Sequence, residues 1–231
     1  RQRLRLFAHY GIDRLVFLHF TPEFAELSAE RFVSEVLFNA LKIQTLVVGP
    51  DAAVGKDRKG DLHYLQQRFA EEGRTLVVEA FYEKHGSKVG SRQIRQLLRE
   101  GDVARAGELL GRSFALDARV VPGEGRGMQL GIPTANIFSR RQVVPARGVY
   151  ATRAHLSEGS YQGVTNVGVK PTFGGSEELV ETHLLDFKER SLYGERMELE
   201  FLEQIRDEKK FDTVEELTQQ IKHDKIGRAH V

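Results

Sequence analysis

The character of the sequence changes near residue 111, and this change constrains the fold more than any other feature. Before it, short apolar runs alternate with segments whose apolar residues recur at helical spacing. After it, short runs with period-two character follow one another, separated by turns rich in Gly, Ser and Pro. The first pattern is typical of βαβ units with a parallel sheet, and the second of an antiparallel barrel or sandwich. We therefore predict two domains, over residues 1–110 and 111–225.

Each half has its own set of expected elements. The predicted strands of the first half cover residues 14–20, 45–48 and 75–80. Helical spacing is found over residues 1–10, where it stops at Gly11, and further helices are predicted over 29–42, 61–72, 91–100 and 102–110. The predicted strands of the second half cover residues 114–121, 149–155, 161–167, 178–187 and 197–205. A final helix is predicted to begin near Thr213, where Thr213 and Glu216 form a capping box.

Composition excludes several classes of protein and of site. The formal net charge is +1, so the chain carries no general field for nucleic acids or other polyanions. It has no cysteine, which excludes disulfides, thiolate zinc sites and a cysteine nucleophile and fits a reducing compartment. No apolar run approaches the length of a membrane span, and no signal peptide is visible. We therefore expect a cytoplasmic protein without a nucleic-acid or membrane partner.

Both ends of the chain have unusual sequences. The first residue is Arg rather than Met. Residues 226–231 have the sequence Ile-Gly-Arg-Ala-His-Val, which one reading frame of a widely used sequencing adapter would encode. We therefore expect both ends to be truncations and leave these six residues out of the fold argument.

Residues 123–136 carry the strongest functional signal. Four glycines in nine positions let a backbone approach a ligand closely, and an arginine adds a cation; these residues are Gly123, Gly125, Arg126, Gly127 and Gly131. If the Pro-Thr-Ala-Asn tail is extended, Thr134 and Asn136 point to the same side. Two neutral oxygens beside N–H donors suit a phosphate–Mg²⁺ group. An ordinary glycine-rich turn with an Asn cap is the alternative, and the segment matches neither the P-loop nor the dinucleotide fingerprint.

A second candidate group lies in residues 179–187. On a strand, Glu181 and His183 share a face with three apolar residues, so we expect that face to point inward. Glu181 would then be a carboxylate at or near a barrel mouth, where partial desolvation suits a general base. The alternative is that Glu181 faces solvent on an edge strand. We interpret His183 as structural, and the other histidines show no metal-ligand spacing.

Six motifs occur in a fixed order through the second half. They are Gly-x-Gly-Arg-Gly-x-x-Leu-Gly-x-Pro-Thr-Ala-Asn, Gly-Val-Tyr-Ala, Asn-Val-Gly-x-Lys-Pro-Thr-Phe-Gly-Gly, Val-Glu-Thr-His-Leu-Leu-Asp-Phe, Leu-Tyr-Gly and Arg-Asp-Glu-Lys-Lys-Phe-Asp. Together they resemble the riboflavin kinase module of the bacterial bifunctional riboflavin kinase/FAD synthetase family, over about residues 111–222. The resemblance implies a six-stranded antiparallel barrel with a C-terminal helix. It also implies ATP-dependent phosphorylation of the riboflavin 5′-hydroxyl to FMN.

The resemblance also implies roles for individual residues. Thr134 and Asn136 would hold Mg²⁺ against the nucleotide phosphates, with Thr134 also contacting the nucleotide, and Glu181 would take the proton from the ribityl hydroxyl. The glycine loop from Gly123 to Gly131 would cover the ATP phosphates. On the flavin side the resemblance places Tyr150, Arg206 and Phe211. The alternatives are that Tyr150 is part of the core, as an aromatic ring more often is, and that the charge run over 206–211 is a solvated face.

The first half resembles the nucleotidyltransferase module of the same family, with departures. The His-x-Gly-His motif of that module does not occur in this chain. Residues 49–55 have the sequence Gly-Pro-Asp-Ala-Ala-Val-Gly where the family has an aromatic-rich loop. Residues 89–95 keep Ser91 and Arg95 of the family's Ile-Ser-Ser-Thr-x-Ile-Arg, but two hydroxyl positions have become Gly90 and Arg92. We therefore expect the chain to lack FAD synthetase activity.

Two other classes of function remain as alternatives. A non-catalytic module that binds a flavin or nucleotide would fit the degraded first half, but loss of function should erase the base early, and Thr134, Asn136 and Glu181 are all present. A barrel that binds nucleic acid is opposed by the near-neutral charge and by the lack of a basic, aromatic-studded strand.

Overall fold

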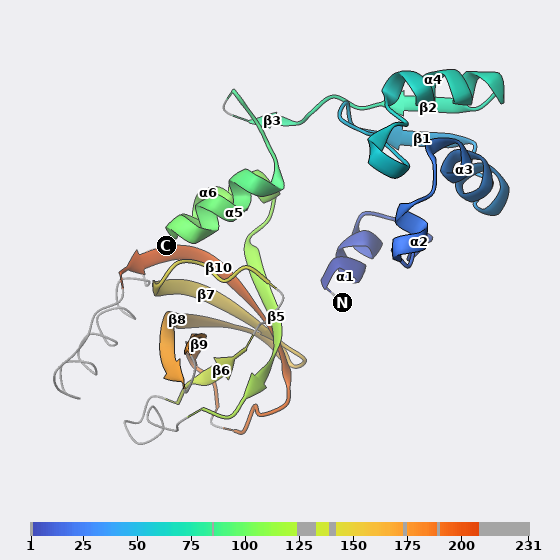
Figure 1. The fold of residues 1–231 in the computed structure, drawn as a ribbon. Coiled ribbons are helices and arrows are strands. Elements are labelled where there is room, and N and C mark those ends of the chain that lie inside the picture. Colours follow the sequence, from blue (N-terminus) through green and yellow to red (C-terminus); the bar gives the residue numbers. More distant parts are fainter. Residues whose placement is uncertain are drawn as a thin grey trace. The chain divides into compact units, whose positions relative to one another are not determined.

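The computed structural model describes residues 2–84, 86–123, 133–138, 142–172, 175–188 and 190–207. The chain divides into two compact units between Lys88 and Val89. Each unit has its own cluster of buried apolar side chains. Figure 1 shows the ribbon of both units.

The first unit is built around a small parallel sheet. Its helices are α1 (Gln2–His9), α2 (Pro22–Ala25), α3 (Ala29–Arg31), the π-helix η1 (Phe32–Ala40), the 3₁₀ turn η2 (Lys56–Arg58) and α4 (Leu62–Glu71). Its strands are β1 (Thr45–Val48), β2 (Thr75–Val78), β3 (Glu83–Lys84) and β4 (Ser87–Lys88). Strands β1 and β2 pair in parallel, as the βαβ pattern predicts. The side chains of η1 and α4 that form the core are Val33, Leu37, Phe38, Leu65 and Phe69.

The prediction of a buried strand over residues 14–20 is wrong. The segment has no regular secondary structure, and the rings of Phe17 and Phe20 are 78% and 75% exposed. An apolar run forms a buried strand only where a neighbouring strand takes its backbone hydrogen bonds. In the described part of this unit, β1 pairs only with β2 and no strand pairs with residues 14–20.

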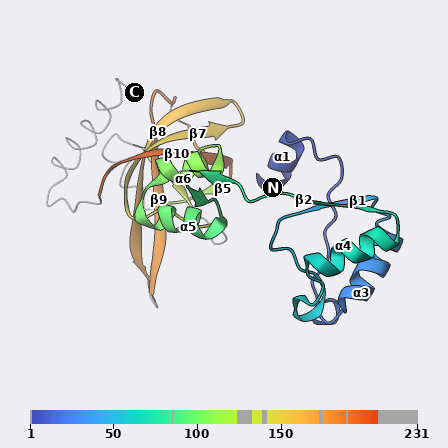
Figure 2. The ribbon, with the colours of Figure 1, turned by 90° about the horizontal axis from the view of Figure 1, so that it is seen from above.

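The second unit is a closed antiparallel barrel of six strands, as predicted. The strands are β5 (Phe114–Val121), β6 (Ala135–Ile137), β7 (Gly148–Leu156), β8 (Gly159–Thr172), β9 (Gly175–Leu184) and β10 (Arg196–Arg206). Their order around the barrel is β10-β5-β6-β9-β8-β7 (Figures 1 and 2). Strand β8 continues five residues past the end predicted for it, so that β8 and β9 pair as far as Thr172 and Gly175. Asn166, which stands next to the predicted end of this strand, therefore lies well inside it.

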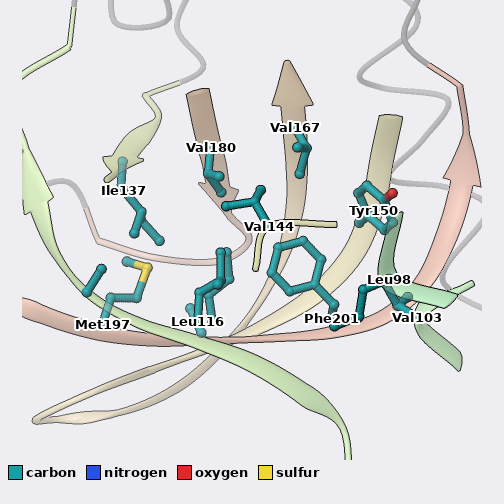
Figure 3. Close-up of a cluster of buried hydrophobic side chains, with 14 of the residues drawn as sticks. Leu98, Val103, Leu116, Ile137, Val144, Tyr150, Val167, Val180, Met197 and Phe201 are labelled. Carbon is teal, nitrogen blue, oxygen red and sulfur yellow. The ribbon is translucent and has the colours of Figure 1, made fainter. Parts of the chain in front are cut away.

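Large apolar side chains fill the barrel. Figure 3 shows side chains from β5, β6, β7, β9 and β10 directed toward one another; they include Leu116, Ile137, Tyr150, Val180, Met197 and Phe201. Burial of this kind stabilises a fold by about 1.5–3 kcal/mol for each large apolar side chain. The strands are therefore held by one continuous core as well as by their closed hydrogen-bond ladder.

Two helices before the barrel share its core. Helix α5 (Ser91–Glu100) ends at Gly101, whose φ of 87° lies in the left-handed region. Helix α6 (Val103–Leu110) begins at Asp102, whose side chain accepts a hydrogen bond from the Arg105 N–H, and it contacts β10 and β5. Because Leu98 and Val103 join the barrel core, the compact unit begins at Val89, upstream of the boundary at residue 111 that the sequence pattern predicts.

Three predictions for the C-terminal part concern residues outside the described ranges. They are the helix near Thr213, the proposed flavin contact at Phe211 and the segment 226–231. Among the helices of the described ranges, none is both long and apolar enough to cross a membrane.

Candidate active site

The Pro-Thr-Ala-Asn segment lies in the barrel wall. Ala135 and Ile137 of β6 belong to the barrel core, so Asn136 between them points to the outer face, where its side chain is still 94% buried. Half-buried Thr134 immediately precedes the strand and follows the same alternation as Asn136. The prediction that an extended tail would bring these two oxygens to one side is consistent with this arrangement.

Three polar residues follow one another across neighbouring strands. Asn136 on β6 is directly opposite Glu181 on β9, and Glu181 is directly opposite Asn166 on β8. Residues directly opposite in an antiparallel ladder share a face, with Cβ atoms about 4.5–5.5 Å apart. Asn136, Glu181 and Asn166 therefore form a polar row on the outer face of the barrel. This row brings the predicted base beside the predicted metal residue.

The row extends toward the residues predicted for the flavin side. Asn166 is directly opposite Val149 on β7, and Val149 is paired with Arg206 on β10. Arg206 follows a register shift in β10 and is half-buried, with its guanidinium donating to the Asp207 carbonyl at 3.1 Å. One line of paired residues thus joins Glu181 to Arg206 through Asn166 and Val149.

The predicted orientation of β9 is wrong. The face that points into the barrel carries Val180, Thr182 and Leu184, so half-buried Glu181 lies on the outer wall and not at the barrel mouth. In the sequence this inward face looks polar because it contains Thr182, which is buried in the structure. Its hydroxyl accepts a hydrogen bond from Thr165 at 2.8 Å, and Thr165 lies 2.8 Å from the Thr152 hydroxyl. This chain of hydroxyl groups satisfies the three side chains inside an otherwise apolar barrel.

Gly123 fits closely against the polar row. A Cβ atom at this position would lie 2.1 Å from Asn136 Nδ2 and 2.7 Å from Asn136 Cγ. Only a residue without a side chain allows the backbone to pass the Asn136 amide at this distance. The first residue of the predicted phosphate loop is therefore in contact with the predicted metal residue. The other predicted loop residues, Gly125, Arg126, Gly127 and Gly131, lie outside the described residues.

His183 contacts the segment that carries Thr134. Its Nδ1 atom lies 2.9 Å from the backbone carbonyl oxygen of Pro133. Because a carbonyl only accepts, the imidazole nitrogen is the donor. The interpretation of His183 as structural is consistent with this hydrogen bond.

The prediction that Tyr150 contacts the flavin is not supported. The ring has no exposed surface, packs edge-on against Phe201 at 5.3 Å between ring centroids, and belongs to the barrel core. Its hydroxyl donates to the Ala146 carbonyl at 2.5 Å. Burial, with a smaller contribution from the negative charge of Asp207, raises the pKa of Tyr150 to about 12. The Gly-Val-Tyr-Ala motif therefore contributes the Tyr150 side chain to the barrel core.

The two remaining nucleotidyltransferase positions lie on the barrel unit. Ser91 and Arg95 are exposed and one turn apart in the first half of α5. The compact unit that contains them begins at Val89, whereas β1 and β2 belong to the other unit.

Asn166 is the site residue that sequence reasoning missed. In the sequence it stands near the end of the strand predicted over residues 161–167, before a run with three glycines and a proline within nine residues, and nothing local indicates its partner. The signal that identifies it is strand register, which the structure supplies by pairing Asn166 with Glu181.

Two family models match the chain, one over each half. The model for Flavokinase (riboflavin kinase) matches residues 110–229, and the model for FAD synthetase matches residues 1–93. The chain belongs to the bifunctional riboflavin kinase/FMN adenylyltransferase family. It carries a riboflavin kinase module, which uses ATP and riboflavin.

Curated members of this family resemble the chain over most of its length. The bifunctional riboflavin kinase/FMN adenylyltransferase of Escherichia coli strain K12 is 37% identical over 227 residues, covering 98% of this chain and 72% of that protein. The enzyme of the same name from Bacillus subtilis is 35% identical over 219 residues, covering 93% and 68%.

A solved structure has the same fold. A crystal structure described as a macrolide-efflux protein from Streptococcus pneumoniae matches with a TM-score of 0.90 and 32% identity. The match covers 100% of this chain and 74% of that one.

Proposed function

We propose that this chain transfers the γ-phosphoryl group of ATP to the 5′-hydroxyl of riboflavin, giving FMN and ADP, at the polar row on the outer wall of the barrel. The observation that carries the proposal is the direct pairing of Glu181 with Asn136, with Gly123 against the Asn136 amide. The pairing brings a carboxylate, an amide oxygen and a glycine backbone to one place. Phosphoryl transfer needs in-line positioning and charge neutralisation more than covalent help.

Glu181 is the proposed general base. As the ribityl oxygen forms its bond to the γ-phosphorus and the bond to the ADP oxygen breaks, the hydroxyl proton passes to the Glu181 carboxylate. The carboxylate is held in the middle of the sheet, with strands β6 and β8 paired on either side of it. A positioned base of this kind contributes about 10²- to 10⁴-fold to rate.

Thr134 and Asn136 are the proposed ligands of Mg²⁺. Mg²⁺ prefers oxygen ligands and is usually held by one or two protein groups together with substrate phosphates. A hydroxyl and an amide oxygen two residues apart fit that role, and among the described residues no cluster of His, Asp and Glu offers another metal site. When bound, the ion would neutralise charge that develops on the phosphate oxygens. The glycine loop beginning at Gly123 is proposed to cover those phosphates.

The flavin is proposed to lie toward Arg206. Arg206 is reached from Glu181 through Asn166 and Val149, so it is far enough along the row to meet a substrate whose reactive hydroxyl is at Glu181. Tyr150 has no part in this contact because its ring lies inside the barrel.

The experiment is direct. The chain is incubated with riboflavin, ATP and MgCl₂, and the flavins are separated by chromatography. FMN that forms only when all three are present supports the proposal. Binding of riboflavin or ATP without FMN would instead support the alternative of a non-catalytic flavin- or nucleotide-binding module.

A further inference from the structure

The barrel fixes the backbone of one proposed metal ligand, Asn136, more firmly than that of the other, Thr134. Strand β6 contains three residues, which pair with β9 as Ala135 with Thr182, Asn136 with Glu181 and Ile137 with Val180. Asn136 therefore has a paired residue on both sides. Thr134 lies just beyond the last pair, where a strand end is free to open.

The next position of the same register would place Thr134 opposite His183. The backbone ladder stops before this position, and the His183 side chain makes a contact there instead. Its Nδ1–H donates to the Pro133 carbonyl at 2.9 Å. Pro133 has no backbone N–H, so its carbonyl is the only hydrogen-bonding group that its backbone can offer. The side-chain bond thus continues the attachment of β6 to β9 by one residue.

We propose that His183 is a positioning residue for Thr134. Its hydrogen bond to Pro133 fixes the peptide that leads into Thr134 and so holds the Thr134 hydroxyl beside Asn136 and Glu181. His183 lies two residues from Glu181 on β9, on the same half-buried outer face. One strand then supplies both the proposed base and the anchor of a proposed metal ligand. The inference rests on the proposed function, because that function gives Thr134 its role.

A set of substitutions at position 183 separates this role from simple packing. In His183→Asn the amide nitrogen is the same number of bonds from Cα as Nδ1, so the donor is kept. In His183→Gln the amide is one bond farther away, and in His183→Leu the donor is lost. Isothermal titration calorimetry with Mg·ADP gives a readout that is independent of turnover.

We expect His183→Leu and His183→Gln to raise the Kd for Mg·ADP about 3- to 10-fold, the range set by loss of one hydrogen bond. His183→Asn should stay within about 2-fold of the wild type. The matched control is His155→Leu, because His155 also lies on a barrel strand and its Nδ1 is 2.7 Å from the Ser160 hydroxyl, away from β6. This control should leave the Kd unchanged. Equal losses in the Asn and Leu variants would overturn the proposal.

A double-mutant cycle tests whether His183 acts through Thr134. If it does, the pair Thr134→Ala and His183→Leu should bind Mg·ADP within about 2-fold of Thr134→Ala alone, because the second change has nothing left to position. Losses that multiply would contradict the proposal. Urea unfolding of each variant checks that the native barrel is present in every titration.

The result for the wild type distinguishes failure of the role proposed for His183 from failure of the proposed function. If the wild type binds Mg·ADP and makes FMN but His183→Leu binds normally, only the role of His183 is wrong. If the wild type neither binds Mg·ADP nor makes FMN, the proposed function fails and the role of His183 fails with it.

Discussion

Glu181 owes its position to the strands on either side of it. Its neighbours in the ladder are Asn136 on β6 and Asn166 on β8, so its backbone is fixed from two directions. A catalytic group on a paired strand is held more precisely than one on a loop. The amides of Asn136 and Asn166 also place uncharged polar groups beside the proposed base.

Tyr150 shows the opposite case, in which a residue from a functional motif serves the core. Its neutral form is favoured by burial in the folded barrel, so its pKa is about 12 there against 10.0 for an ordinary tyrosine. Between pH 10 and 12 the unfolded chain loses this proton while the folded chain keeps it. The folded state is therefore penalised as the pH rises through this range, and the full stability is present only below pH 10.

We expect Tyr150→Phe to remove this part of the pH dependence. The free energy of unfolding of the wild type should fall by about 2 kcal/mol more than that of the variant between pH 10 and 12, because one pKa unit corresponds to about 1.4 kcal/mol. Urea unfolding at several pH values measures both curves. Parallel curves for the two proteins would show that Tyr150 ionises normally in the folded state.

At the scale of elements, strand β6 and the chain at Gly123 form one structural group. Val121 at the end of β5 is directly opposite Asn136, and Gly123 follows two residues later against the Asn136 amide. The loop predicted to cover phosphates therefore begins at Gly123, beside Asn136, the residue predicted to hold the metal. A side chain at position 123 would push the amide away from Glu181.

We expect Gly123→Ala to weaken Mg·ADP binding roughly 10-fold, because the new methyl group displaces the Asn136 side chain, a cost typical of overpacking. Calorimetry measures the Kd. Gly90→Ala is the matched control, since position 90 has open space around it and an extended backbone with φ of −156°. Normal binding by Gly123→Ala would place the nucleotide elsewhere.

Several helix ends were predicted well because they carry local signals, although most of the helix predicted over 29–42 is the π-helix η1. Ser28, Asp61 and Asp102 each accept a hydrogen bond from a backbone N–H in the first turn of a helix, and Gly101 and Gly111 end α5 and α6 in left-handed conformations. These contacts lie within a few residues of sequence. The fold of the barrel half was likewise visible in the period-two runs and in the ordered motifs.

The strand faces could not be predicted because they depend on partners distant in sequence. Thr182 is buried only because Thr165 on β8 satisfies its hydroxyl, and this reversed the predicted face of β9. Asn166 was missed for the same reason, since its place beside Glu181 follows from pairing. The exposed segment with Phe17 and Phe20 shows the converse, an apolar run without a strand partner in the described residues.

At the scale of the whole molecule, the two compact units match two family models of different chemistry. Residues 1–93 match FAD synthetase, yet the loop at 49–55 lacks the aromatic residues of the family pattern and the chain contains no His-x-Gly-His. The polar row at which we propose the reaction lies on the barrel unit.

We therefore expect kinase activity without adenylyl transfer. Incubation of the chain with FMN, ATP and MgCl₂ should give no FAD by chromatography, while riboflavin in a parallel sample is converted to FMN. FAD in the first sample would show that the unit formed by residues 1–88 is active despite these departures.

The central claim is that Glu181 takes the proton of the riboflavin 5′-hydroxyl beside a metal held at Asn136. The most direct measurement is the steady-state rate of FMN formation by the wild type and by Glu181→Gln, with riboflavin, ATP and MgCl₂. We predict that kcat falls about 10²- to 10⁴-fold in Glu181→Gln. The KM for ATP should change little, because Glu181 acts on the acceptor hydroxyl. FMN formation by Glu181→Gln at the wild-type rate would contradict the account.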